Sequence, residues 1–167
     1  STFPFLESVF PVLEKLALKH KFCLRIVGAH HSGITLQGVD VDSVDWELGR
    51  DVESFSSLDI GLYPIVPKGA ANEDWINGKS GFKAIQYMAV GVPFVMSPVG
   101  ACGEIGIPGT THFNATSEED WYTALDTLLS DDDRRNRMGM AGRKCAVDNF
   151  GLETHADMIA DVLRSVA

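Results

Sequence analysis

The 167-residue sequence has few cysteines and few basic residues, and each shortage excludes a class of protein. Its three cysteines, Cys23, Cys102 and Cys145, share no spacing, which favours reduced thiols in a cytoplasmic protein over a disulfide framework. Lysine and arginine total 14 against 23 acidic residues, and the formal net charge of −9 would repel nucleic acid and anionic membranes. No segment reads as a transmembrane helix or a signal peptide. An anionic ligand must therefore meet local positive groups.

Several ligand-binding motifs are also missing. The histidines are scattered without the spacing of a zinc site, so we expect no metal and no organic cofactor. Residues 28–33 have the glycine spacing of a phosphate-binding loop, but Ile34 stands where that loop needs lysine. The first predicted strand is not followed by the Gly-x-Gly-x-x-Gly turn of a dehydrogenase.

Helical and strand patterns alternate along the chain. Apolar spacing predicts a helix over residues 6–17 bent at Pro11, strands over 22–27, 39–44 and 59–65, and a polar helix over 47–55. A loop over 67–77, a helix from about Ser80, a strand from residue 94 and a short strand within 110–114 follow. Ser117 and Ser130 are expected to cap two helices, and Gly151 precedes a last amphipathic one. The pattern predicts one Rossmann-like α/β domain over residues 1–167, with a mostly parallel sheet and helices on both faces.

The most informative segment covers residues 78–100, GKSGFKAIQYMAVGVPFVMSPVG. It reads as a glycine turn, a helix with a cationic first turn, a Gly-x-Pro break and a buried strand. A helix N-terminus presents unpaired N–H groups and about half a positive charge, so Lys79 and Lys83 there suit a phosphate or diphosphate. The alternative is that both are ordinary solvated lysines.

This segment resembles the carboxy-terminal domain of group 1 glycosyltransferases, retaining enzymes with two facing Rossmann domains (the GT-B fold). The resemblance implies a nucleoside diphosphate sugar as donor, with the acceptor and most catalytic groups on the enzyme's own amino-terminal domain. Such domains open with a strand, whereas this sequence opens with a helix. We therefore expect a fragment, the carboxy-terminal half of a longer enzyme, with the first strand missing and no activity by itself.

The resemblance also implies residue roles, and it exposes a departure. The family pattern has two glutamates separated by seven residues, one for the donor sugar and one for the ribose; here these positions are Gly78 and Gln86. Gln86 keeps an amide able to bind ribose, although it is equally explained as a packing residue. Gly78 has no side chain.

The remaining expected donor contacts lie around this helix and after the second strand. Ser80 is either the helix cap or a phosphate ligand, and Trp46 either stacks on the nucleobase or packs in the core. The full predicted donor set is Lys79, Ser80, Gly81, Lys83, Gln86, Gly100 and Trp46. The catalytic residues stay unassigned.

Two other functions remain open from the sequence. A non-catalytic interaction module that kept the fold would explain the two missing acids. A sugar-nucleotide epimerase of the same architecture is also compatible, because a fold does not decide its chemistry.

Overall fold

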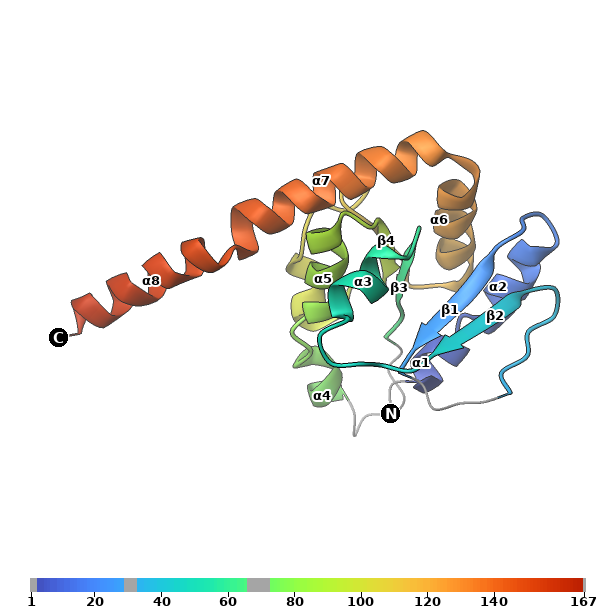
Figure 1. The fold of residues 1–167 in the computed structure, drawn as a ribbon, viewed down its shortest axis with the longest axis horizontal. Helices are drawn as coiled ribbons and strands as arrows, with labels where there is room; N and C mark the ends of the chain where they lie inside the picture. The colour runs from blue at the N-terminus through green and yellow to red at the C-terminus, as the bar shows by residue number, and fades with distance from the viewer. Residues whose placement is uncertain (1–2, 29–32, 66–72, 167) are drawn as a thin grey trace.

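The computed structural model describes residues 3–28, 33–65 and 73–166. Its strands form two parallel sheets (Figure 1). The first sheet pairs β1 (Cys23–Val27) with β2 (Asp40–Val44), and the second has the order β3 (Gly61–Tyr63), β4 (Phe94–Met96), β5 (Phe113–Asn114). The predicted α/β fold with parallel strands is confirmed.

Helices pack on both faces of strand β4, and α2 packs on one face of the β1–β2 sheet (Figure 1). The helices are α1 (Phe3–Glu7), α2 (Phe10–Ala17), α3 (Asp51–Ser56), α4 (Glu73–Asn77), α5 (Phe82–Val90), α6 (Glu118–Ser130), α7 (Asp132–Phe150) and α8 (Leu152–Ser165). A 3₁₀ helix over Gly100–Glu104 follows β4.

Strand β4 is apolar throughout because helices cover both of its faces. All three of its residues are buried: Val95 belongs to the core formed with α2 and α6, whereas Phe94 and Met96 belong to the core formed with α5. A parallel strand covered by helices on both faces has no solvent side, so its sequence has no polar alternation.

The helix predicted over residues 6–17 is two helices instead of one bent helix. Pro11 lies in the first turn of α2, after the N-cap residue Val9. In that position the missing N–H of proline removes no helical hydrogen bond, so Pro11 starts a helix and does not bend one.

Other boundaries also differ from prediction. The helix α3 begins at Asp51 and not at residue 47, after Gly49 with a φ of 88°. The predicted loop over 67–77 ends in helix α4, and its residues 67–72 lie outside the described residues.

Of the two predicted serine caps, one is confirmed. The Ser117 hydroxyl accepts a hydrogen bond from the Asp120 N–H at 3.1 Å and completes a capping box. Ser130 is instead the last residue of α6, and Asp131 caps α7 by accepting from the Arg134 N–H at 2.8 Å. A carboxylate one residue later was the better cap, because it also carries a charge favourable at a helix N-terminus.

The last helix, α8, projects away from the rest of the molecule (Figure 1). It is amphipathic as predicted, but its apolar side chains Met158, Ile159, Val162 and Leu163 are all exposed. No helix among the described residues combines the length and apolarity needed to cross a membrane. The three cysteines are free thiols.

Candidate functional site

Helix α5 begins at a glycine that no other residue could replace without movement. Gly81 is the N-cap residue with a φ of 67°, and a Cβ there would lie 2.1 Å from Ile105 Cδ1. The helix has no side-chain cap, so the prediction of Ser80 as the cap is wrong. The αL backbone at Gly81 sets the start of the helix instead.

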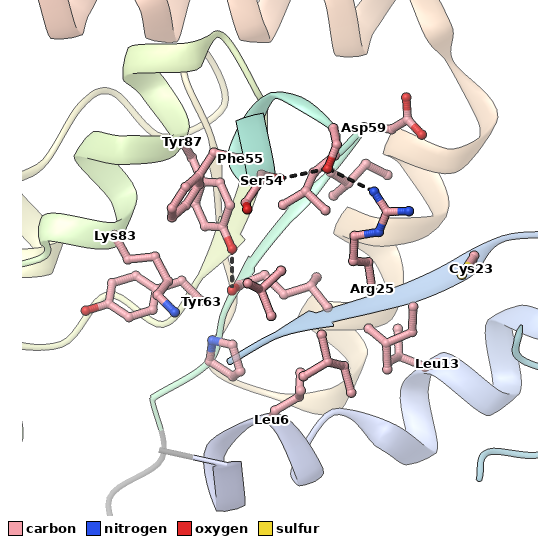
Figure 2. Close-up of a pocket in the computed structure, with 18 of the residues that line it drawn as sticks. Leu6, Leu13, Cys23, Arg25, Ser54, Phe55, Asp59, Tyr63, Lys83 and Tyr87 are labelled. Carbon is pink, nitrogen blue, oxygen red and sulfur yellow. Dashed lines mark hydrogen bonds between the residues drawn. The ribbon is translucent and has the colours of Figure 1, made fainter. Parts of the chain in front are cut away.

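Lys83 lies in the first turn of α5 and reaches into a large cavity (Figure 2). Its side chain as a whole is exposed, but desolvation by the cavity walls lowers the pKa of Lys83 below its usual value. The positive charge of Lys79 lowers it further. Among the described residues no carboxylate pairs with Lys83, so a desolvated cation at a helix N-terminus stands without a counter-charge.

Lys79 lines the same cavity but is partly engaged. Its Nζ lies 3.9 Å from the ring centroid of Trp75 and 5.6 Å from that of Phe5. These cation–π contacts fix the ammonium at the end of α4, beside the start of α5. Lys79 therefore contributes a positioned charge, whereas Lys83 makes no cation–π contact or ion pair with the described residues.

Gln86 is one turn after Lys83 and lines the cavity with it. Its amide has no hydrogen-bond partner within the described part of the chain, so its donor and acceptor remain available to a ligand. Gly78 is exposed and does not line the cavity.

Trp46 also faces the cavity, beyond the end of β2. It is 53% exposed, so the interpretation as a core residue is wrong. Its Nε1–H donates to Asp51 Oδ1 at 2.7 Å, and a Cβ on Gly28 would lie 3.1 Å from Trp46 Cβ. Asp51 thus orients the indole ring, the turn after β1 lies close to the Trp46 Cβ, and about half of the side chain stays exposed. The sequence analysis did not predict this hydrogen bond to Asp51. The only sign of it in the sequence is an acidic residue five positions after Trp46.

The cavity has a volume of about 1160 Å³ and reaches the carboxyl ends of β1 and β3. Gly28 and Pro64, the residues that follow these two strands, line it together with Lys83 (Figure 2 shows Lys83 beside Tyr63). Desolvation by the cavity raises the pKa of Tyr63 to about 12, with a smaller effect of Cys102, so its hydroxyl stays protonated at neutral pH. In open parallel sheets, ligands bind outside these carboxyl ends of the strands.

The structure brings together four of the seven predicted donor residues: Lys79, Lys83, Gln86 and Trp46 all line the cavity. Ser80, Gly81 and Gly100 do not line it, and their ligand contacts stay predictions. The structure explains glycine at position 100 without a ligand, because a Cβ there would lie 2.3 Å from the Asn77 carbonyl oxygen.

Parallel strands covered by helices, with a cavity at the strand ends, define a Rossmann-like domain. Solved structures share this fold. A glycosyltransferase from Rickettsia africae matches with a TM-score of 0.72 and 15% identity over 95% of this chain and 43% of its own. HepE of Anabaena, solved with UDP and glucose, matches with a TM-score of 0.61 and 17% identity over 75% of this chain and 32% of its own.

A third match is the C-terminal domain of the group 1 glycosyltransferase LpcC from Francisella tularensis, with a TM-score of 0.53 and 19% identity. It covers 69% of this chain and 57% of the LpcC chain. The chain thus spans about a third to somewhat over half of these solved chains, the LpcC chain being itself a C-terminal domain. No family model and no curated protein matches. The chain therefore has the fold of the group 1 glycosyltransferases, as the sequence resemblance predicted.

Proposed function

We propose that this chain is the donor-binding domain of a glycosyltransferase, and that it binds a nucleoside diphosphate sugar. The observation that carries the proposal is Lys83, a desolvated cation at a helix start that lines a cavity at the strand ends and to which the described residues offer no carboxylate partner. HepE, which shares the fold, is solved with UDP and glucose, and this supports the ligand class.

Each cavity residue has a role that suits one part of this ligand. Lys83 and the first turn of α5 bind the diphosphate, with Lys79 adding a fixed charge. The Gln86 amide hydrogen-bonds the ribose, and the exposed ring of Trp46 stacks on the nucleobase. The sugar, the acceptor and the reacting groups belong to the full-length protein, with an amino-terminal domain supplying most of the chemistry.

A titration with UDP, ADP and GDP at millimolar concentration, followed by backbone amide NMR, tests the proposal. We expect shifts confined to Trp46, residues 78–86 and residues 100–104. If the amides of Lys83 and Gln86 stay unmoved in a folded protein, donor binding by this chain is excluded.

A second candidate function is a non-catalytic interaction module. Two observations favour it: the acids of the family pattern are replaced by Gly78 and Gln86, and the apolar face of α8 is exposed. The same titration separates the candidates, because an interaction module needs no nucleotide site.

Nucleotide binding is expected to weaken at a lower alkaline pH than it would if the binding lysine had its usual pKa. The protonated form of Lys83 binds the diphosphate, and its pKa is lowered from 10.5 by desolvation and by Lys79. Affinity therefore falls as pH rises through this lowered pKa, and a bound anion raises the pKa, so binding takes up a proton in that range. Calorimetry in two buffers of different ionisation enthalpy measures this uptake. It should disappear in Lys83→Gln.

The Trp46→Ala variant is expected to lower nucleotide affinity by about tenfold, because stacking of a base on an aromatic ring contributes roughly 1–3 kcal/mol. Trp46→Phe is the matched control, since it keeps an aromatic face and loses only the hydrogen bond to Asp51. Equal affinity of the wild type and Trp46→Ala would show that the base lies elsewhere.

A further inference from the structure

Asp51 brings a carboxylate into the cavity that we propose as the nucleotide site. It is the first residue of α3 and lines the cavity together with Trp46. Its Oδ1 accepts the hydrogen bond from Trp46 Nε1–H at 2.7 Å, and among the described residues it makes no ion pair. Each carboxylate oxygen has two lone pairs, so both oxygens of Asp51 can accept further hydrogen bonds. A carboxylate in a site for an anion repels the ligand unless it meets hydrogen-bond donors there.

The other acids of this segment are neutralised and lie outside the cavity. Arg50 Nε donates to Glu53 Oε2 at 3.0 Å, and Arg50 Nη1 lies 3.4 Å from Glu47 Oε2. Both glutamates are exposed, and neither lines the cavity. Arg50, the cation next to Asp51 in the sequence, is therefore engaged by other partners. Asp51 differs from both glutamates because it lines the cavity and has no cation within the described part of the chain.

The backbone places the indole ring and the carboxylate next to each other. The Gly28 N–H donates to the Val44 carbonyl at 2.9 Å, which ties the end of β2 to the turn after β1, two residues before Trp46. Gly49 then has a φ of 88°, a left-handed conformation that turns the chain into α3. The relative position of Trp46 and Asp51 is thus set by these backbone features and by the hydrogen bond between the two side chains.

A base stacked on the exposed ring of Trp46 lies beside this carboxylate, because Asp51 binds the nitrogen at the edge of the ring. A carboxylate only accepts hydrogen bonds, so it favours a base with N–H groups on the facing edge. Guanine has two adjacent donors, N1–H and the N2 amino group, and two carboxylate oxygens can accept from both.

The other bases place an acceptor next to each donor. In adenine N1 lies beside the N6 amino group, in cytosine N3 lies beside the N4 amino group, and in uracil two carbonyls flank N3–H. Each of these acceptors would face an oxygen of the Asp51 carboxylate and repel it. Selectivity then comes from a favourable contact with one base and unfavourable contacts with the rest.

We propose that Asp51 is a specificity-determining residue and that the nucleotide bound beside Trp46 carries guanine. This inference rests on the proposed function, since it names the base of the nucleoside diphosphate sugar. Trp46 supplies a stacking surface, which any base can use. Asp51 supplies the discrimination, because guanine pairs with both of its oxygens, whereas another base leaves a buried acceptor unpaired.

Calorimetric titration of the wild-type protein with GDP, ADP and UDP is the first test. Affinity for GDP should exceed the affinity for ADP and for UDP by roughly 10- to 100-fold, because hydrogen bonds to a charged group are strong. Equal affinities, or a preference for ADP or UDP, would contradict this inference and leave the proposed function intact. No binding of any of the three nucleotides would contradict the proposed function itself.

The Asp51→Asn variant tests the residue. Its amide oxygen can still accept from Trp46 Nε1–H, while its amide nitrogen offers a donor where the carboxylate offered an acceptor. GDP affinity should fall by roughly 10- to 100-fold. Xanthosine diphosphate has a C2 carbonyl in place of the amino group of guanine, so it should bind the variant roughly tenfold more tightly than it binds the wild type.

Glu53→Gln is the matched control, with the same change from acid to amide on the same helix. Glu53 pairs with Arg50 at 3.0 Å and does not line the cavity, so both affinities should stay within about twofold of the wild type. An Asp51→Asn variant that unfolds cooperatively and keeps the wild-type order of affinities would overturn the proposal, and so would equal changes in both variants. If Asp51→Asn does not fold, the wild-type order of GDP, ADP and UDP decides.

Discussion

Replacing Lys83 with glutamine is expected to weaken nucleoside diphosphate binding by about 10- to 100-fold, because a hydrogen bond to a charged group contributes about 1.5–3 kcal/mol. The expected loss is large since Lys83 has no competing carboxylate among the described residues and loses its charge fully. Calorimetric titration with UDP, ADP or GDP measures the change. Folding should survive, because removing a desolvated charge relieves a cost that the folded state carries.

The matched control is Lys144→Gln, which makes the same change of charge and shape far from the site. Lys144 lies on α7, where its Nζ pairs with Asp148 at 2.6 Å, and it does not line the donor cavity. Its affinity should stay within about twofold of the wild type, since exposed pairs contribute little. Equal losses in both variants would mean that only the overall charge of the protein matters, and the role of Lys83 would be refuted.

The Gly139→Ala variant is expected to lose about 3 kcal/mol of stability, because α7 crosses the end of α5 at this glycine. A Cβ on Gly139 would lie 2.1 Å from the Gly91 carbonyl oxygen. That carbonyl cannot easily move, since Gly91 is the αL C-cap of α5 and its N–H bonds to Met88 at 3.0 Å. Thermal unfolding should show a fall of about 10 °C in Tm.

Gly142→Ala, one turn later on the same helix, is the control. Both glycines are buried in α7, but a Cβ on Gly142 would lie 3.4 Å from Cγ of Met88, a flexible side chain that can adjust. The gain in helix propensity, up to about 1 kcal/mol, should offset this contact. If the two variants lose the same stability, the close contact with Gly91 is not the cause, and replacing any glycine of α7 has the same effect.

Some residues of the predicted donor site could be placed from local sequence patterns, whereas others could not. Lys83 and Gln86 are three residues apart, so they lie on one face of their helix. Glycines mark both ends of that helix, Gly81 at the N-cap and Gly91 at the C-cap. The place of Lys83 and Gln86 in one cavity was therefore predictable. Trp46 was ambiguous, because an aromatic residue after a strand suits a core as well as a surface, and only its neighbours Asp51 and Gly28 decide its exposure.

Predicted helix boundaries were wrong where one residue type is compatible with two positions in a helix. Pro11 fits either a bend inside a helix or the first turn of one, and the structure places it in the first turn of α2. Ser80 looked like a cap, yet the N-cap residue is Gly81, whose αL backbone favours glycine, and the helix starts at Phe82.

The sequence by itself determined the alternation of strands and helices, the parallel sheet and the cationic start of α5, because hydrophobic period and glycine punctuation are local properties. Only the tertiary structure decided that Lys83 has no carboxylate partner within the described residues, that Lys79 lies against the ring of Trp75, and that residues of β1 and β3 line one cavity. These depend on which residues far apart in the chain become neighbours, and no local pattern encodes such distances.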